Sequence, residues 1–251
     1  MKKIFMLGAI FALLFVPASV SNAAKSPLTA GISQASLLRS YKNLNVNIFA
    51  LNKTKKQTKN LTETDKSIIA KYVYGAVKGE NTYLLMNCYL RGNLNLYLEP
   101  KDITKPLKSR MEYYSNSLTS TISKVKHTQN TLLYRGIDEK GFCFIFPDTN
   151  VKEYASRPVT EETALTLKNK LYNKTFIEKG FMSTAYDINY AKKTKFIFLV
   201  KAPKNIQAVL VDGLKENNTK EIIINRGYSW KVTDVKSVEN KYYLITLKLC
   251  L

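Results

Sequence analysis

The sequence is poor in metal-binding residues, in chain-breaking residues and in acidic charge. One histidine and three cysteines in 251 residues argue against a zinc site built from these ligands. Ten glycines and seven prolines are too few for a collagen-like or linker-rich chain. Only 19 acidic residues stand against 39 basic ones, which gives a net charge of +20. With 45% hydrophobic residues the chain has enough apolar surface to fold, so a disordered protein is excluded.

Long apolar runs are also lacking, and the longest one stands at the start of the chain. Lys2 and Lys3 precede an apolar stretch over residues 4–16, and the small residues Ser21-Asn22-Ala23 follow it. This order is typical of a cleaved secretory signal, which we predict over residues 1–23, with an uncleaved anchor as the alternative. We therefore expect a secreted bacterial protein that does not insert stably into a membrane.

The three cysteines leave the redox state of the chain open. In an exported protein an odd number of cysteines allows one disulfide, and three buried thiols are the alternative. The sequence does not select a pair among Cys88, Cys143 and Cys250.

A basic cluster occupies the segment before the first acidic residues. Its lysines lie among polar residues, so we predict a solvated loop or helix end there. A solvated basic face is the plain interpretation, and contact with an anionic membrane, a nucleic acid or an acidic host partner is the other. The cluster consists of Lys53, Lys55, Lys56 and Lys59.

The apolar pattern changes from helical to strand-like near residue 130. Helical spacing predicts helices near residues 32–41, 65–73, 82–91 and 106–122. Short apolar runs then predict strands near 132–135, 196–200, 209–211, 221–224, 230–232 and 242–249, with one helix at 161–171. Helices followed by strands indicate an α+β fold in a single mature domain.

Two pairs of residues could hold an anionic ligand. Arg135 ends an apolar run and precedes Gly136, so a guanidinium fork stands where the backbone can approach a phosphate closely. Asn87 and Arg91 are spaced i, i+4 and lie on one helix face. The alternatives are a surface arginine and a helix face that binds a neighbouring loop.

Hydroxyl groups and a carboxylate stand at the ends of two further strands. Ser183 and Thr184 follow apolar residues, and their hydroxyls can bond a ligand or a neighbouring carboxylate. Glu221 precedes three isoleucines, so it stands at the mouth of a buried strand and could stabilise a developing cation. Each pattern taken alone is common.

Taken together and in order, these patterns resemble the mono-ADP-ribosyltransferases of the Arg-Ser-Glu class. The family's strand-end Arg, its aromatic-x-Ser-Thr element, its catalytic Glu and its helical Tyr-x-x-x-Asn-x-x-Leu-Arg-Gly element all have counterparts. They are Leu133-Tyr134-Arg135-Gly136, Phe181-Met182-Ser183-Thr184-Ala185, Glu221 to Gly227, and Tyr83, Asn87, Leu90, Arg91 and Gly92. The architecture is most similar to the small clostridial Rho-modifying exoenzymes.

The resemblance implies a fold, a co-substrate and a domain plan. The fold is an N-terminal helical subdomain followed by a mainly antiparallel, two-sheet β core. A helical and basic segment at residues 24–62 would precede the catalytic domain at residues 63–251. The co-substrate is NAD, and no metal is needed. We expect a monomer that acts on a host protein, with a small GTPase or actin as candidates.

The resemblance also implies roles for single residues. Glu221 would be catalytic, with Ser183 orienting it and Arg135 beside it. Binding of NAD would fall to Arg135 and Ser183 together with Tyr83, Asn87, Arg91, Gly136 and Thr184.

The sequence departs from the family pattern where the acceptor is recognised. Thr219 stands where arginine-modifying members carry Glu and asparagine-modifying members carry Gln. Thr219 and Asn217 would therefore meet the target with different chemistry, and Glu216 is a substitute carboxylate nearby. Ala185 replaces the third residue of the Ser-Thr-Ser element, a position that varies in the family.

Three other functions remain open on the sequence alone. Without a protein acceptor the enzyme would be an NAD glycohydrolase. Thr219 favours a catalytically inactive binding protein of the same fold, although Arg135, Ser183 and Glu221 are all retained. The positive charge favours a nucleic-acid-binding module, but no nucleic-acid motif is present and the export signal argues against it.

Overall fold

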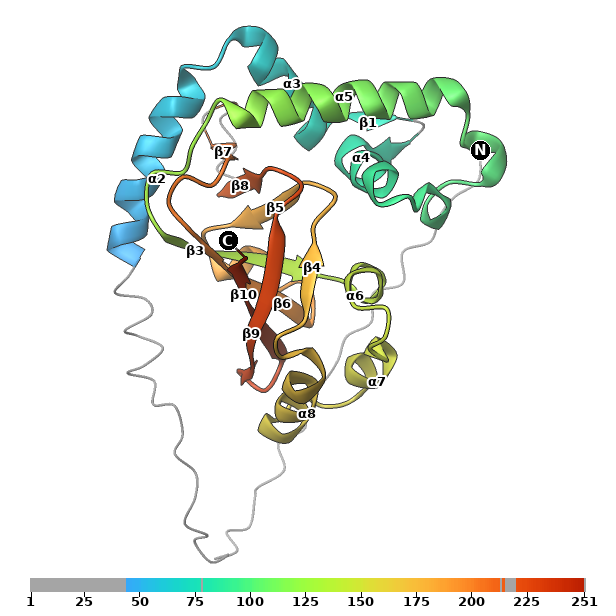
Figure 1. Cartoon of the computed structure of the whole chain (residues 1–251), viewed down its shortest axis with the longest axis vertical. Coiled ribbons are helices and arrows are strands. Elements are labelled where there is room, and N and C mark those ends of the chain that lie inside the picture. The colour runs from blue at the N-terminus through green and yellow to red at the C-terminus, as the bar shows by residue number, and fades with distance from the viewer. Residues whose placement is uncertain (1–43, 78, 213, 215–219, 251) are drawn as a thin grey trace, which may run out of the picture. The chain divides into compact units, whose positions relative to one another are not determined.

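A computed structural model describes residues 44–77, 79–212, 214 and 220–250, with the backbone alone for residues 44–51. Helices come first along the chain and strands dominate the second part, so the predicted α+β class is confirmed (Figure 1). The predicted signal at 1–23 and the helix near 32–41 lie outside the described residues. Among the described helices, none has the length and apolarity needed to cross a membrane.

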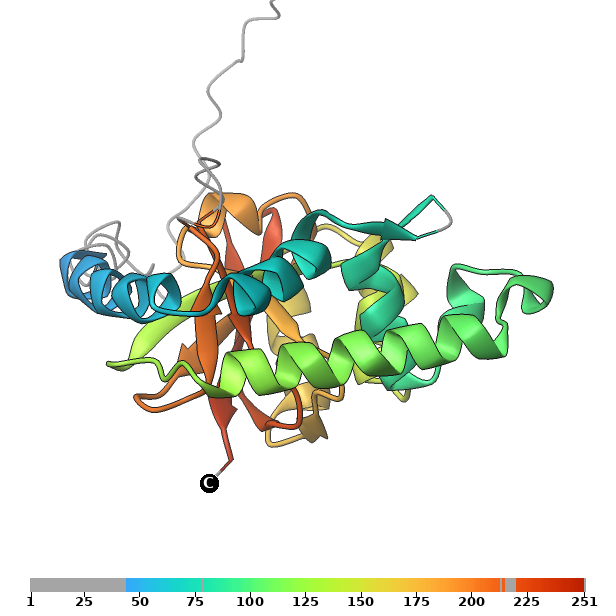
Figure 2. The same cartoon turned by 90° about the horizontal axis from the view of Figure 1, so that it is seen from above.

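Four helices and a small hairpin form the helical subdomain. They are α2 (Leu44–Lys59), α3 (Glu63–Tyr74), α4 (Thr82–Arg91) and α5 (Lys105–Ser123), with β1 (Ala76–Val77), β2 (Glu80–Asn81) and the 3₁₀ turns η1 (Leu94–Leu96) and η2 (Pro100–Asp102). Helices α3, α4 and α5 lie side by side when viewed from above (Figure 2). The predictions near 65–73, 82–91 and 106–122 are therefore confirmed as helices.

Capping chemistry explains where two of these helices begin. Thr62 caps α3, since its hydroxyl accepts from the Asp65 backbone while the Asp65 carboxylate accepts from the Thr62 backbone. This capping box starts α3 at Glu63, slightly before the predicted position. Thr104 caps α5, and Pro106 sits in its first turn, where a missing N–H costs nothing.

The strands form one eight-stranded sheet in the order β4-β9-β10-β6-β3-β5-β8-β7. The strands are β3 (Thr131–Ile137), β4 (Thr175–Ile177), β5 (Met182–Ala185), β6 (Phe196–Ala202), β7 (Ala208–Leu210), β8 (Glu221–Ile224), β9 (Ser229–Val238) and β10 (Tyr242–Leu249). Among the pairings of these described strands, only that of β10 with β6 is parallel. A single pair, Tyr134 with Ala185, joins β3 to β5. The two sheets expected from the sequence are therefore two blocks of one sheet, β4-β9-β10-β6-β3 and β5-β8-β7, which meet at this narrow link.

Three helices follow β3 where one was predicted. The helix at α8 (Glu161–Leu171) is confirmed, but α6 (Glu139–Ile145) and α7 (Val151–Ser156) were not predicted. Both are shorter than two full turns, which is too short for an apolar repeat to be recognised. The Asp138 side chain accepts from the Gly141 backbone and so starts α6. A short turn, η3 (Ile188–Tyr190), follows β5.

Two hydrophobic cores cover opposite faces of the sheet. One lies between the sheet and helices α6 to α8, and the other lies under helices α3 to α5. Strand β8 shows why both can exist, because Ile222 and Ile224 belong to the first core and Ile223 to the second. Alternate residues of a strand face opposite sides, so a strand of consecutive isoleucines fits between two cores. Glu221, at its start, shares the face of Ile223 and therefore faces the helical subdomain.

Helix α2 packs against the sheet through buried threonines. The Thr58 hydroxyl accepts from the Leu210 backbone at 3.3 Å, and Thr54 hydrogen-bonds His127 at 3.2 Å. Lys53, Lys56 and Lys59 are exposed, so the predicted basic cluster is the solvated end of a helix.

The three cysteines, Cys88, Cys143 and Cys250, are free thiols. Cys88 is buried and Cys143 is exposed, so the alternative of three buried thiols holds for Cys88 but not for Cys143.

Candidate active site

A pocket of about 540 Å³ lies between the helical subdomain and the sheet. Tyr83, Asn87, Arg91 and Tyr97 line it from the helical side, and Tyr134, Arg135, Ser183 and Glu221 from the sheet. Lys140 and Phe144 of α6 and Tyr190 of η3 border it as well. The four sequence patterns that were spread along the chain therefore meet in one concave site.

Ser183 and Glu221 form the polar centre of the sheet wall. Strand β5 pairs antiparallel with β8 so that Ser183 lies opposite Ile223 and Ala185 opposite Glu221. Ser183 and Glu221 are thus diagonal neighbours on one face, and the Ser183 hydroxyl donates to Glu221 Oε1 at 2.5 Å. Burial raises the pKa of Glu221, the Ser183 hydrogen bond opposes this rise, and the charge of Asp212 adds to it.

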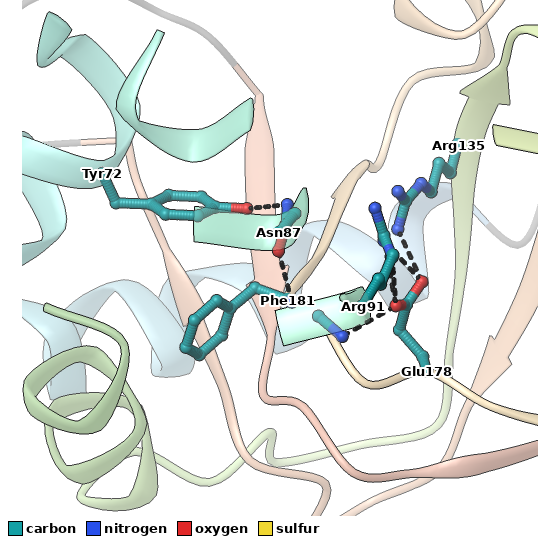
Figure 3. A network of polar contacts seen from close by, with 7 residues as sticks. Tyr72, Asn87, Arg91, Arg135, Glu178 and Phe181 are labelled. Atoms are coloured by element: carbon teal, nitrogen blue, oxygen red, sulfur yellow. Dashed lines mark hydrogen bonds and ion pairs between the residues drawn. The ribbon is translucent and has the colours of Figure 1, made fainter. Parts of the chain in front are cut away.

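Two arginines from different elements meet at a buried carboxylate, Glu178 (Figure 3). Arg91 ends α4 and donates from Nε and Nη2 to the two Glu178 oxygens at 3.0 and 2.9 Å. Arg135 in β3 approaches Glu178 Oε2 with Nη1 at 3.5 Å. Two guanidinium groups and one carboxylate leave a net positive charge beside the pocket, which suits an anionic group such as a diphosphate.

Asn87 holds the helical wall against the sheet (Figure 3). Its Oδ1 accepts from the Phe181 backbone at 2.7 Å, and its Nδ2 donates to the Tyr72 hydroxyl at 3.0 Å. Asn87 and Arg91 both bond to the segment that leads into β5, which is the alternative of a helix face that binds a neighbouring loop. The Asn87 side chain lines the pocket while its amide is engaged inside the protein.

The remaining predicted binding residues lie at the pocket with different surroundings. The Tyr83 side chain is 39% exposed and packs edge-on against Tyr72. Thr184 is buried, and its hydroxyl donates to the Ile222 carbonyl at 2.7 Å, so it joins β5 to β8. A β-carbon on Gly136 would lie 2.6 Å from the Ala191 carbonyl oxygen, so this glycine lets the loop after η3 approach β3.

The predicted acceptor-recognition residues Thr219 and Asn217 lie outside the described residues, as does Glu216. The described residues on either side of them are tied to the sheet. The Tyr186 hydroxyl donates to Asp212 Oδ2 at 2.8 Å. Lys220 adopts a φ of +50° and binds Asp187 through an ion pair of 2.9 Å.

Comparison with known protein families identifies the family to which this chain belongs. The family model described as ADP-ribosyltransferase exoenzyme matches residues 46–251, which include every described strand and the whole pocket. The chain belongs to the ADP-ribosyltransferase exoenzyme family. No match to a curated protein is found.

Solved structures of ADP-ribosyltransferases share the fold. C3stau2 from S. aureus, solved with NAD, is 19% identical with a TM-score of 0.64, over 82% of this chain and 95% of that one. The Clostridium limosum C3 exoenzyme is 17% identical with a TM-score of 0.63, over 83% and 95%. The toxin BECa of C. perfringens, solved with NADH, is 21% identical with a TM-score of 0.63, over 81% of this chain but 48% of its own.

The sequence of this exoenzyme family member did not lead us to predict Glu178 or most of the aromatic residues that line the pocket. Glu178 lies in the loop shortly before Ser183. The signal that the sequence offered was an isolated acidic residue, close to Gly180, in a basic chain. Tyr97, Tyr134, Phe144 and Tyr190 come from four separate elements, so only the fold brings them together. In the described part of the chain, no group of three or more His, Cys, Asp or Glu side chains could hold a metal ion.

Proposed function

We propose that the protein is a secreted NAD-dependent mono-ADP-ribosyltransferase that modifies a host protein. The observation that carries the proposal is that one pocket is lined by the hydrogen-bonded pair Ser183–Glu221 together with Arg91 and Arg135. Membership of the exoenzyme family and the NAD with which C3stau2 was solved support the choice of NAD over other diphosphates. The apolar, aromatic lining suits the two flat rings of this molecule.

The residues of the pocket match the charges of NAD. The diphosphate would lie near Arg91 and Arg135, because charge-assisted hydrogen bonds from guanidinium groups are the strongest that a protein offers to phosphate. Tyr83 and Phe144 would cover the rings, and Gly136 and Thr184 would shape the wall beside the nicotinamide ribose. Asn87 would act on this site mainly by fixing α4 to the Phe181 backbone.

Glu221 would perform the central chemical role. The bond that breaks joins the nicotinamide nitrogen to C1′ of the ribose, and nicotinamide leaves with the bonding electron pair. Glu221 would accept a hydrogen bond from the ribose 2′-hydroxyl and stabilise the cation that develops at C1′. Ser183 keeps the carboxylate oriented. The acceptor then supplies an electron pair to C1′ and releases a proton to solvent.

The acceptor decides whether the reaction is a transfer or a hydrolysis. Thr219 has neither the carboxylate nor the amide that the resembling enzymes use toward their protein targets. Hydrolysis of NAD by water is therefore the second candidate function. The protein target would contact the segment between Asp212 and Thr219.

Transfer of ³²P-labelled ADP-ribose from NAD to proteins of a host-cell lysate tests the proposal. We expect one or a few labelled bands with the wild type and none with Glu221→Gln. Nicotinamide release without any labelled band would establish the hydrolase instead. No release under either condition would overturn both candidates.

A further inference from the structure

Glu178 stands behind the pocket wall and is almost completely enclosed. Its side chain is 3% exposed, and both carboxylate oxygens are occupied. Oε1 accepts from Arg91 Nε at 3.0 Å and from the Gly180 backbone at 2.9 Å. Oε2 accepts from Arg91 Nη2 at 2.9 Å and faces Arg135 Nη1 at 3.5 Å. Glu178 does not line the pocket, so it acts there only through the groups that it holds.

The backbone around Glu178 gives this carboxylate a fixed position. Its N–H donates to the Tyr228 carbonyl at 3.0 Å, and its carbonyl accepts from the Gly227 N–H at 2.8 Å. Strand β4, which ends one residue earlier, pairs with β9. Glu178 is therefore anchored to the sheet, whereas Arg91 belongs to the helical subdomain, and the clamp fixes the guanidinium of Arg91 to the sheet side of the pocket.

Arg91 and Arg135 carry the same charge, yet both lie beside the Glu178 carboxylate. Burial lowers the pKa of Arg135, Glu178 counteracts this effect, and the charge of Arg91 adds to it. Two guanidinium groups repel each other in a partly buried site, and a carboxylate between them offsets this repulsion. Arg91 donates its two hydrogen bonds to Glu178 from Nε and Nη2. The Nη1 side of Arg91 is therefore left for a ligand.

We propose that Glu178 is a positioning residue that holds the Arg91–Arg135 pair in the arrangement that binds the diphosphate of NAD. The proposal rests on the proposed use of NAD by this pocket. Preorganised donors bind a ligand more tightly than mobile ones, because their ordering has been completed during folding. A carboxylate anchored to the sheet and bound to both arginines provides such ordering before the ligand arrives.

The simplest competing role for Glu178 is that of a charge neutraliser, and the two roles predict opposite results. If Glu178 only reduced the positive charge, Glu178→Gln would make the pocket more positive and would tighten diphosphate binding. If Glu178 positions the arginines, the same change weakens binding. The glutamine keeps the size, but its amide nitrogen would face the arginine donors, so the two-point bond is lost.

Calorimetric titration with ADP-ribose and with adenosine separates the roles, because adenosine lacks the diphosphate. For Glu178→Gln we expect ADP-ribose affinity to fall by about 10-fold or more, and adenosine affinity to change by less than about 2-fold. Unchanged or tighter ADP-ribose binding by the variant, beside normal binding by the wild type, would overturn the positioning role alone. A wild type that binds no ADP-ribose would overturn both this role and the proposed function.

Two further variants keep the test decisive. Asp65→Asn removes another buried carboxylate that forms an ion pair. Asp65 Oδ1 binds Lys124 Nζ at 2.7 Å, and neither residue lines the pocket. We expect this control to leave both affinities unchanged. If Glu178→Gln does not fold, Arg91→Lys tests the same clamp, because lysine carries the charge but cannot form the two-point bond. ADP-ribose binding by Arg91→Lys at the wild-type level would then contradict the proposal.

Discussion

A β-carbon on Gly180 would lie 2.7 Å from the side-chain oxygen of Asn87. The same carbon would lie 3.2 Å from Arg91 Nη2, so the absence of a side chain lets the helical wall meet the segment before β5. The Asn87 bond to the Phe181 backbone and the Arg91 bonds to Glu178 both depend on this close approach. The distance between the two walls of the pocket is therefore set in part by a glycine.

Gly180→Ala should accordingly push α4 away from the sheet. Overpacking of this kind costs about 1–3 kcal/mol of unfolding free energy. We expect a lower urea midpoint and a higher KM for NAD, since Arg91 is displaced from the pocket. Lys179→Ala, at an exposed neighbouring position, serves as the control and should change neither quantity. A Gly180→Ala protein with the KM of the wild type would show that the walls can adjust freely.

Glu221→Gln should stabilise the fold at neutral pH. The pKa of Glu221 is raised in the folded state, with burial as the main cause, so its ionised form is disfavoured there. The stability that this group contributes is present below its unfolded pKa and is lost as pH rises through the folded pKa. Gln is neutral throughout, so the variant should exceed the wild type at pH 7 and match it near pH 4. Urea unfolding at both values checks this, and a less stable variant at pH 7 would contradict it.

His127 should make the protein sensitive to acid. Burial lowers the pKa of His127 to about 4, and its ring is enclosed between Thr54 and Thr131. Below about pH 6.5 the unfolded chain binds a proton that the folded protein does not, so stability falls between that pH and about 4. The slope in this window reaches at most about 1.4 kcal/mol per pH unit.

The matched variant His127→Gln should flatten this part of the curve, although it lowers stability at pH 7. The window is separate from that of Asp65. Burial raises the pKa of Asp65, but hydrogen bonds from Lys124, Thr62 and Thr121 lower it overall to about 2, so its contribution is lost only below pH 3.8. A variant whose stability declined between pH 6.5 and 4 as steeply as the wild type would exclude His127 as the cause.

Thr219→Gln should affect the acceptor and not the cleavage of NAD. The change introduces the amide of the asparagine-modifying enzymes that the chain resembles, and it leaves Glu221, Ser183 and the arginines untouched. We expect nicotinamide release without acceptor to stay within about 3-fold, because the groups at the transferred ribose are the same. The pattern of labelled lysate proteins should change. A large loss of nicotinamide release would place Thr219 in the cleavage step.

The main elements and the two-part layout could be predicted because each left a local pattern. Strand β8 is a run of isoleucines, and α8 has a capped start with an apolar repeat. Helices α6 and α7 are too short for such a pattern. The start of α3 shifted because the reciprocal bonds of Thr62 and Asp65 outweigh the hydrophobic spacing.

The residues that belong to a short motif were predicted for the candidate site and do line one pocket, whereas the residues outside a motif were not predicted. Glu221 and Ser183 were predicted to interact from a family pattern, and their hydrogen bond is present. Glu178 was not predicted, because its two arginine partners lie 87 and 43 residues away in sequence. A sequence shows the charge of a carboxylate but not the distant groups that surround it.

The role of Glu221 in NAD cleavage is tested by measuring nicotinamide release from NAD by the purified protein and by Glu221→Gln. We expect steady release by the wild type and a loss of at least about 100-fold in the variant, the scale expected when a key electrostatic group is removed. Circular dichroism should show that both proteins are folded. Equal release by the two proteins would contradict the assignment of Glu221 as the catalytic carboxylate of this pocket.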